Sequence, residues 1–182
     1  DVYKRQVILN VYIDFWRNIM SLITEKFKQL ADDQNVKFKD RVVEQPIKNK
    51  DGEEVTQKQH AFQTGLQVNK DKVVPCSVII QESPSDRVNY QITYNRIGYV
   101  TDRNKIGSVL EELNELNRVR SGYYHFAISK DGELIMRNLG ITGEDVRPLI
   151  NTFVFGARIL RALYQELDQI SGLDLSQSNQ AN

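Results

Sequence analysis

The amino-acid sequence predicts an α+β fold, a two-layer sandwich in which an antiparallel sheet has helices packed on one of its faces. Three observations support this prediction. Hydrophobic residues recur at helical spacing near both ends, the middle of the chain alternates at every second residue, and turn-forming clusters separate the alternating runs. The expected order is helix, strands, helix, β-hairpin and long helix.

Residues 1–19 are expected to be a non-native leader. Residues 1–6 match a translated sequencing adapter, and residues 16–20 back-translate to a bacterial ribosome-binding site followed by the start codon of Met20. Such a segment is excluded from fold reasoning. The alternative is a genuine amphipathic helix at the N-terminus.

The first predicted helix follows Met20. Its apolar residues share helical spacing, Ser21 is available as N-cap, and a cluster of acidic and amide residues, 32–35, marks its end. These apolar residues are Leu22, Ile23, Phe27 and Leu30.

Four alternating segments then predict an antiparallel meander between residues 36 and 100. The segments cover about 36–45, 62–68, 74–80 and 88–94. Residues 46–59 are polar and contain Asp51-Gly52, which is typical either of a hairpin tip or of a mobile loop.

The second half of the chain predicts two helices on either side of a hairpin. Residues 103–117 carry one hydrophobic stripe, and the segments that flank Asp131-Gly132 alternate as hairpin strands do. The last helix, 145–170, is the longest. Pro148 suits its first turn, because no intrahelical N–H is lost there.

The length of 182 residues fits one domain, which we expect over residues 20–170. Residues 171–182 are rich in Ser, Gln and Asn, and we expect them to form a disordered tail.

Composition narrows the classes of function. The chain is 40% hydrophobic and 26% charged, with a mean hydropathy of −0.48, as is usual for globular proteins. Lys plus Arg and Asp plus Glu both number 24, so the basic excess typical of nucleic-acid binding is missing. We expect neither nucleic acid nor membrane as a partner. The single cysteine favours a reducing cytoplasm.

The sequence offers few candidates for catalytic or metal-binding residues. Cys76 alternates with apolar residues and is expected to be buried, and neither His60 nor His125 has a second His or Cys at metal-ligand spacing. We therefore expect no enzyme activity, no cofactor and no metal. The alternative is a small hydrolase or transferase that uses loop carboxylates and His125.

The reverse face of the predicted sheet is more apolar than a solvated face should be. If Val74, Cys76, Val78 and Ile80 face the helices, their neighbours in sequence face the other way. Either these are scattered surface hydrophobes, which are common, or they form a contiguous patch that binds a partner. The candidate partner-binding residues, called the reverse face below, are Val73, Pro75, Ile79, Tyr123, His125, Ala127 and Ile135.

The element order, with residues 113–117 (LNELN), the hairpin 123–137 and the apolar residues of the last helix, resembles the YbjN family and the related type III secretion chaperone-like fold. The resemblance covers about residues 20–170. It implies a cytosolic module without cofactors, acting as a regulator or as a chaperone that holds an extended partner segment, often as a homodimer. Non-catalytic binding of a protein or peptide is therefore the expected function, with strand addition at an open sheet edge as a further contribution.

Overall fold

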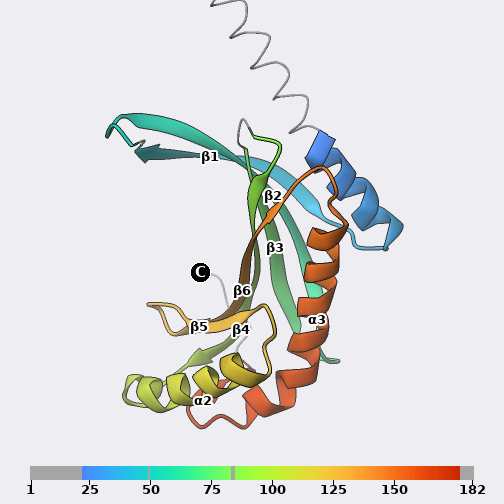
Figure 1. Ribbon diagram of the computed structural model, residues 1–182. Coiled ribbons are helices and arrows are strands. Elements are labelled where there is room, and N and C mark those ends of the chain that lie inside the picture. The colour runs from blue at the N-terminus through green and yellow to red at the C-terminus, as the bar shows by residue number, and fades with distance from the viewer. Residues whose placement is uncertain (1–21, 49, 83–84, 177–182) are drawn as a thin grey trace, which may run out of the picture. The chain divides into compact units, whose positions relative to one another are not determined.

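The computed structural model describes residues 22–48, 50–82 and 85–176, so the expected leader, 1–19, and residues 177–182 of the expected tail lie outside the described residues. The described part contains an antiparallel sheet of seven strands, with the order β1-β2-β3-β4-β6-β5 and β7 pairing with β4 (Figure 1). The α+β fold class predicted from the sequence is confirmed.

The elements follow the expected order. After a helix over residues 22–33 come β1 (Lys39–Lys48), β2 (Glu54–Gln67), β3 (Val73–Gln81), β4 (Val88–Val100), the short helix η1 (Arg103–Lys105), α2 (Ile106–Val119), β5 (His125–Ile128), β6 (Glu133–Thr142), α3 (Arg147–Asp168) and β7 (Leu173–Asp174). The described chain divides into two compact units. They are not successive segments, since β2, β3, β4, β6 and α3 each contribute residues to both.

The first unit consists of residues 1–62, 79–90 and 140–151, as far as these are described. Its helix, 22–33, buries Phe27 completely against aromatic neighbours. The ring centroid of Phe27 lies 4.8 Å from that of Phe62 in β2 and 5.4 Å from that of Phe38. Of the residues that the helical spacing predicted to face inward, Ile23 and Phe27 are therefore buried, whereas Leu30 is half-buried and Leu22 is exposed.

Strands β1 and β2 are hydrogen-bonded neighbours in the sheet and form a hairpin, in agreement with the hairpin-tip interpretation of residues 46–59. The tip contains Gly52, whose φ of +82° lies in the region that glycine adopts without steric cost because it has no Cβ. Both strands reach further into the polar stretch than expected. Their side chains there are mainly exposed, so hydrophobic alternation could not reveal them.

The second unit consists of residues 63–78, 91–139 and 152–182, as far as these are described, and its core is aromatic. The ring of Tyr94 stacks on Phe153 of α3, with centroids 5.8 Å apart and planes 11° apart. The Tyr94 hydroxyl donates to the Phe153 carbonyl at 2.5 Å, and the Tyr124 hydroxyl donates to the Thr152 carbonyl at 2.8 Å. Each buried phenol therefore has a hydrogen-bond acceptor on the helix that covers it.

The chain orders further than expected at its C-terminus. Leu173 pairs with Val100 and Asp174 with Tyr99, which forms β7 where a disordered tail was expected from residue 171. Burial of Leu173 and Leu175 accounts for this order, since they are the apolar residues of an otherwise polar stretch. The ordered part therefore extends beyond the expected boundary at 170.

Candidate functional site

The structure places the predicted reverse face on the more accessible side of its strands. Within β3, Val74, Cys76 and Val78 are nearly or fully buried, whereas Val73 is 53% exposed and Pro75 is half-buried. In the second unit Tyr123 and His125 are exposed, and Ala127 and Ile135 are half-buried. Ile79 is half-buried and belongs to the first unit.

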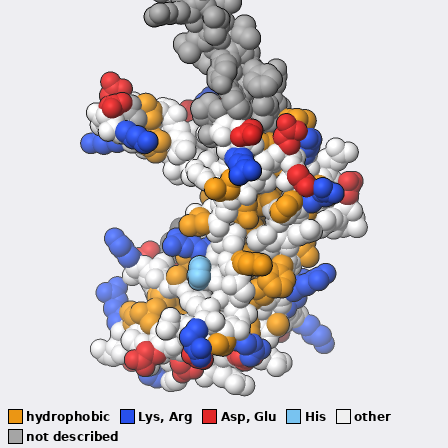
Figure 2. Space-filling model, in the orientation of Figure 1, with side chains coloured by type: hydrophobic (Ala, Val, Ile, Leu, Met, Phe, Trp, Pro, Cys, Tyr) orange, Lys and Arg blue, Asp and Glu red, His pale blue; other side chains and the backbone are white. Residues whose placement is uncertain are grey.

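The register of the β5–β6 hairpin brings four positions into two cross-strand pairs. Ala127 lies opposite Ile135, and His125 lies opposite Arg137. Residues directly opposite in an antiparallel pair share a face, so an apolar pair and a cationic or polar pair follow one another on the outer side of the hairpin. Figure 2 shows hydrophobic and basic side chains at the surface near this hairpin.

Two exposed hydrophobic residues of β6 were not predicted. Leu139 is 63% exposed and Ile141, in the first unit, is 65% exposed. Both continue the alternation of Ile135 and Arg137 beyond the end of the expected hairpin. The alternation of β6 as far as residue 142 was the signal that could have identified them.

An aromatic pair borders the hairpin. Tyr123 is 74% exposed and its ring lies 6.3 Å from that of Phe155 on α3, which is 43% exposed. The Tyr123 carbonyl accepts a hydrogen bond of 2.8 Å from the Asn138 side-chain amide. The main chain at Tyr123 is therefore held in place while its ring remains accessible.

The outer edge of β5 is already occupied. The Asn117 side chain in α2 accepts from the Phe126 N–H at 2.7 Å and donates to the Phe126 carbonyl at 2.9 Å, as a neighbouring strand would. Figure 1 shows α2 beside the hairpin. At the opposite end of the strand order, β1 contains Pro46, which has no N–H to offer a ladder. Phe126 in β5 and the missing N–H of Pro46 in β1 are therefore two positions at which these edge strands cannot take part in strand addition, which stays a prediction.

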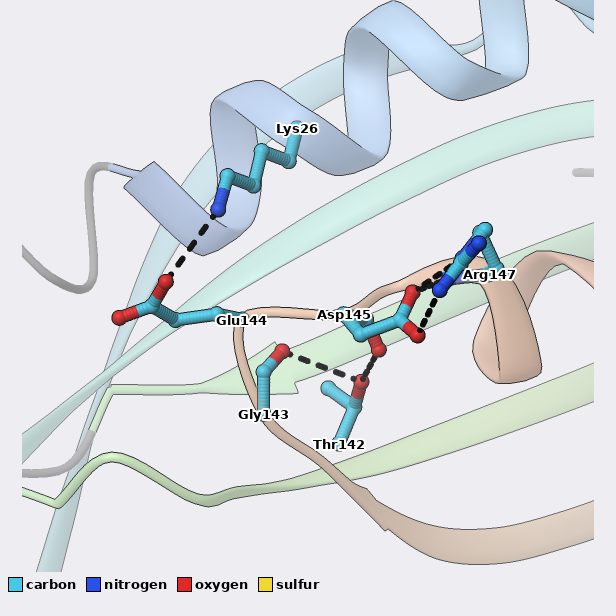
Figure 3. A network of polar contacts seen from close by, with 6 residues as sticks. All are labelled: Lys26, Thr142, Gly143, Glu144, Asp145 and Arg147. Carbon is cyan, nitrogen blue, oxygen red and sulfur yellow. Dashed lines mark hydrogen bonds and ion pairs between the residues drawn. The ribbon is translucent and has the colours of Figure 1, made fainter.

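The charged residues around the start of α3 form a local network (Figure 3). Lys26 pairs with Glu144 at 3.4 Å, and the Arg147 guanidinium donates to both carboxylate oxygens of Asp145 at 2.7–2.8 Å. The Arg147 guanidinium lowers the pKa of Asp145 to about 2. Asp145 also accepts from the Arg147 N–H at 3.1 Å. The bond from the Arg147 N–H satisfies a backbone donor in the first turn of α3, and the remaining contacts are ion pairs between these side chains.

The residues expected to matter for the enzyme alternative come from both units. His125 is exposed beside Arg137, and the loop carboxylates at 32–33 and 51–54 belong to the other unit. In the described ranges, no three side chains of His, Cys, Asp or Glu gather as metal ligands.

Cys76 is 2% exposed, and its thiol donates to the Val74 carbonyl at 3.2 Å. Burial raises the pKa of the thiol to about 12, so the reactive thiolate is scarce at neutral pH. We expect the folded protein to react slowly with a thiol reagent and the denatured protein to take up one label, because the sequence has one cysteine. Mass spectrometry of the labelled protein measures this, and rapid stoichiometric labelling of the native state would contradict the burial.

No protein-family model matches the sequence, and a search of curated proteins finds no match. Among the described helices, none combines the length and the apolar character needed to cross a bilayer.

Proposed function

We propose that this protein is a non-catalytic module that binds an extended segment of another protein on its reverse face, as a chaperone-like or regulatory protein of the YbjN type. The observation that carries this proposal is the outer side of the β5–β6 hairpin. There Tyr123 and Leu139 are largely exposed, next to the half-buried pair Ala127–Ile135. Removal of such side chains from water by a partner favours association.

The spacing of these side chains favours an extended partner. Ile135, Arg137 and Leu139 lie at alternate positions of β6, so they repeat about every 6.7 Å along the strand. The side chains on one face of an extended peptide repeat at the same interval. A peptide that alternates apolar and polar residues therefore matches the surface residue by residue.

A double substitution tests the proposal. Ile135→Thr with Leu139→Thr places a β-branched residue with strand propensity at both positions and removes apolar area from the outer side of β6. Each buried branched side chain contributes roughly 1.5–3 kcal/mol, so we expect the double variant to bind more than tenfold more weakly. Fluorescence anisotropy measures the affinity for labelled peptides of about twelve residues, selected from an array of alternating apolar and polar sequences.

Val42→Thr is the matched control, because Val42 is a β-strand residue that is 57% exposed on β1. We expect it to bind the same peptides as the unaltered protein. Equal binding by the double variant would reject the reverse face as the site.

Sedimentation velocity on the same variants tests the expected homodimer. A hydrolase or transferase would instead turn over a peptide or ester substrate in a manner that depends on His125.

A further inference from the structure

A polar hollow opens in the second unit, where β2, β3, β4 and β6 contribute its lining. Its volume is about 450 Å³. The residues that line it are Gln63, Thr64, Pro75, Cys76, Ser77, Asn95, Arg96 and Glu133. Pro75 belongs to the reverse face, so this polar hollow adjoins the surface to which the proposed function assigns the partner segment.

Two of these residues, Asn95 and Arg96, lie where the alternation of buried and exposed side chains along β4 is interrupted. Tyr94 and Ile97 are both fully buried although they are three residues apart, and the two between them are half-buried Asn95 and exposed Arg96. An inserted residue of this kind is the signature of a β-bulge. In a regular strand one of any two consecutive side chains faces the core. Here neither Asn95 nor Arg96 is buried.

The backbone of Arg96 has an unusual conformation at this interruption. Its φ is +54°, in the left-handed region where glycine is the favourable residue. The Arg96 N–H donates to Oε1 of Glu133 at 2.7 Å, which fixes the backbone there. Strain of this kind is found where the surrounding structure holds a side chain in place for binding.

The chemistry of the hollow fits a neutral group that both donates and accepts hydrogen bonds. One cation, Arg96, is balanced by one anion, Glu133, and the amides of Gln63 and Asn95 offer donors and acceptors together. In the described part of the chain, the Arg96 guanidinium takes part in no ion pair and the two amides in no hydrogen bond. A peptide bond presents this combination of one N–H and one carbonyl.

We infer that the polar hollow binds the main chain of the extended partner segment, with Arg96 donating to a peptide carbonyl. This inference rests on the proposed function. The apolar residues of the reverse face then contact the side chains of the segment, and the hollow contributes affinity that is independent of side-chain sequence. Arg96 is thus a binding residue that hydrophobic periodicity does not identify.

Arg96→Gly tests the inference, because it removes the guanidinium while glycine accepts the positive φ without strain. We expect the variant to keep or raise its melting temperature and to bind the array-selected peptide about tenfold more weakly, as for one lost hydrogen bond to a charged group. Replacement of single peptide carbonyls along the peptide by thiocarbonyls, which accept hydrogen bonds more weakly, should weaken binding to the unaltered protein at one position or more. That penalty should shrink in Arg96→Gly, as coupling in a double-mutant cycle requires.

Arg137→Gln is the matched control, since Arg137 lies on the outer side of the β5–β6 hairpin and is not among the residues lining the hollow. It should retain the full penalty of the thiocarbonyl replacement. Peptide binding that Ile135→Thr with Leu139→Thr weakens, but that Arg96→Gly and thiocarbonyl replacement leave unchanged, would overturn the inference and leave the proposed function intact. Absence of peptide binding by the unaltered protein would overturn both. Displacement of the peptide by a neutral oligosaccharide through Arg96 would assign the hollow to a different class of ligand and overturn the inference.

Discussion

Phe27→Ala is expected to lower the free energy of unfolding by about 3–5 kcal/mol, as for other fully buried phenylalanines. Phe27 is the central ring of an aromatic cluster, in contact with Phe38 and Phe62. Its removal leaves a cavity between the first helix and β2 as well as losing apolar burial. Urea denaturation followed by circular dichroism measures the change.

Leu22→Ala is the control on the same helix. Leu22 is 40% exposed, so its truncation should cost about 1 kcal/mol or less. Alanine has high helix propensity, so neither substitution weakens the helix through its backbone. Equal losses from the two variants would show that the helix contributes through something other than the Phe27 cluster.

Phe126→Ala is the second substitution with a large expected effect, again about 3–5 kcal/mol. Phe126 is 4% exposed on β5, and its main chain is held by Asn117. The neighbouring position Ala127 faces the other side of the strand, opposite Ile135. Phe126→Ala therefore tests the core side of a hairpin whose outer side is proposed to bind.

Ile135→Thr provides the comparison on the outer side. Ile135 is half-buried, so this substitution should cost much less stability than Phe126→Ala while it weakens peptide binding. Thermal unfolding and fluorescence anisotropy on both variants separate the two effects. If Ile135→Thr unfolded the protein and Phe126→Ala changed only binding, the two faces of the hairpin would have been assigned in reverse.

The candidate site was predictable where it follows from strand alternation. Val73 and Pro75 alternate with Val74 and Cys76, so a pattern of period two assigns the two pairs to opposite faces of the strand. Leu139 was missed because the expected hairpin ended too early. Arg96 was missed because its position depends on a slip in the alternation, visible in sequence only as the spacing from Tyr94 to Ile97.

The sequence by itself determined the fold class and the order of the elements, and it divided the residues of β3 between two opposite faces. These features depend on local periodicity and on turn residues such as Asp131-Gly132, where Gly132 has a φ of +82°. Pro148, the second residue of α3, follows from the same local chemistry.

Only the tertiary structure decided which groups meet across the chain. Asn117 pairs with the Phe126 main chain, Glu133 accepts from the Arg96 N–H, and Leu173 pairs with Val100 after the chain has passed through α3. Each contact joins two separate segments of the chain. Hydrophobic periodicity describes each segment by itself and does not predict which segments come together. An amide or a carboxylate has the same sequence signature on a solvated surface as at a sheet edge, because its partner is brought to it by the packing of the whole sheet and not by its neighbours in the chain.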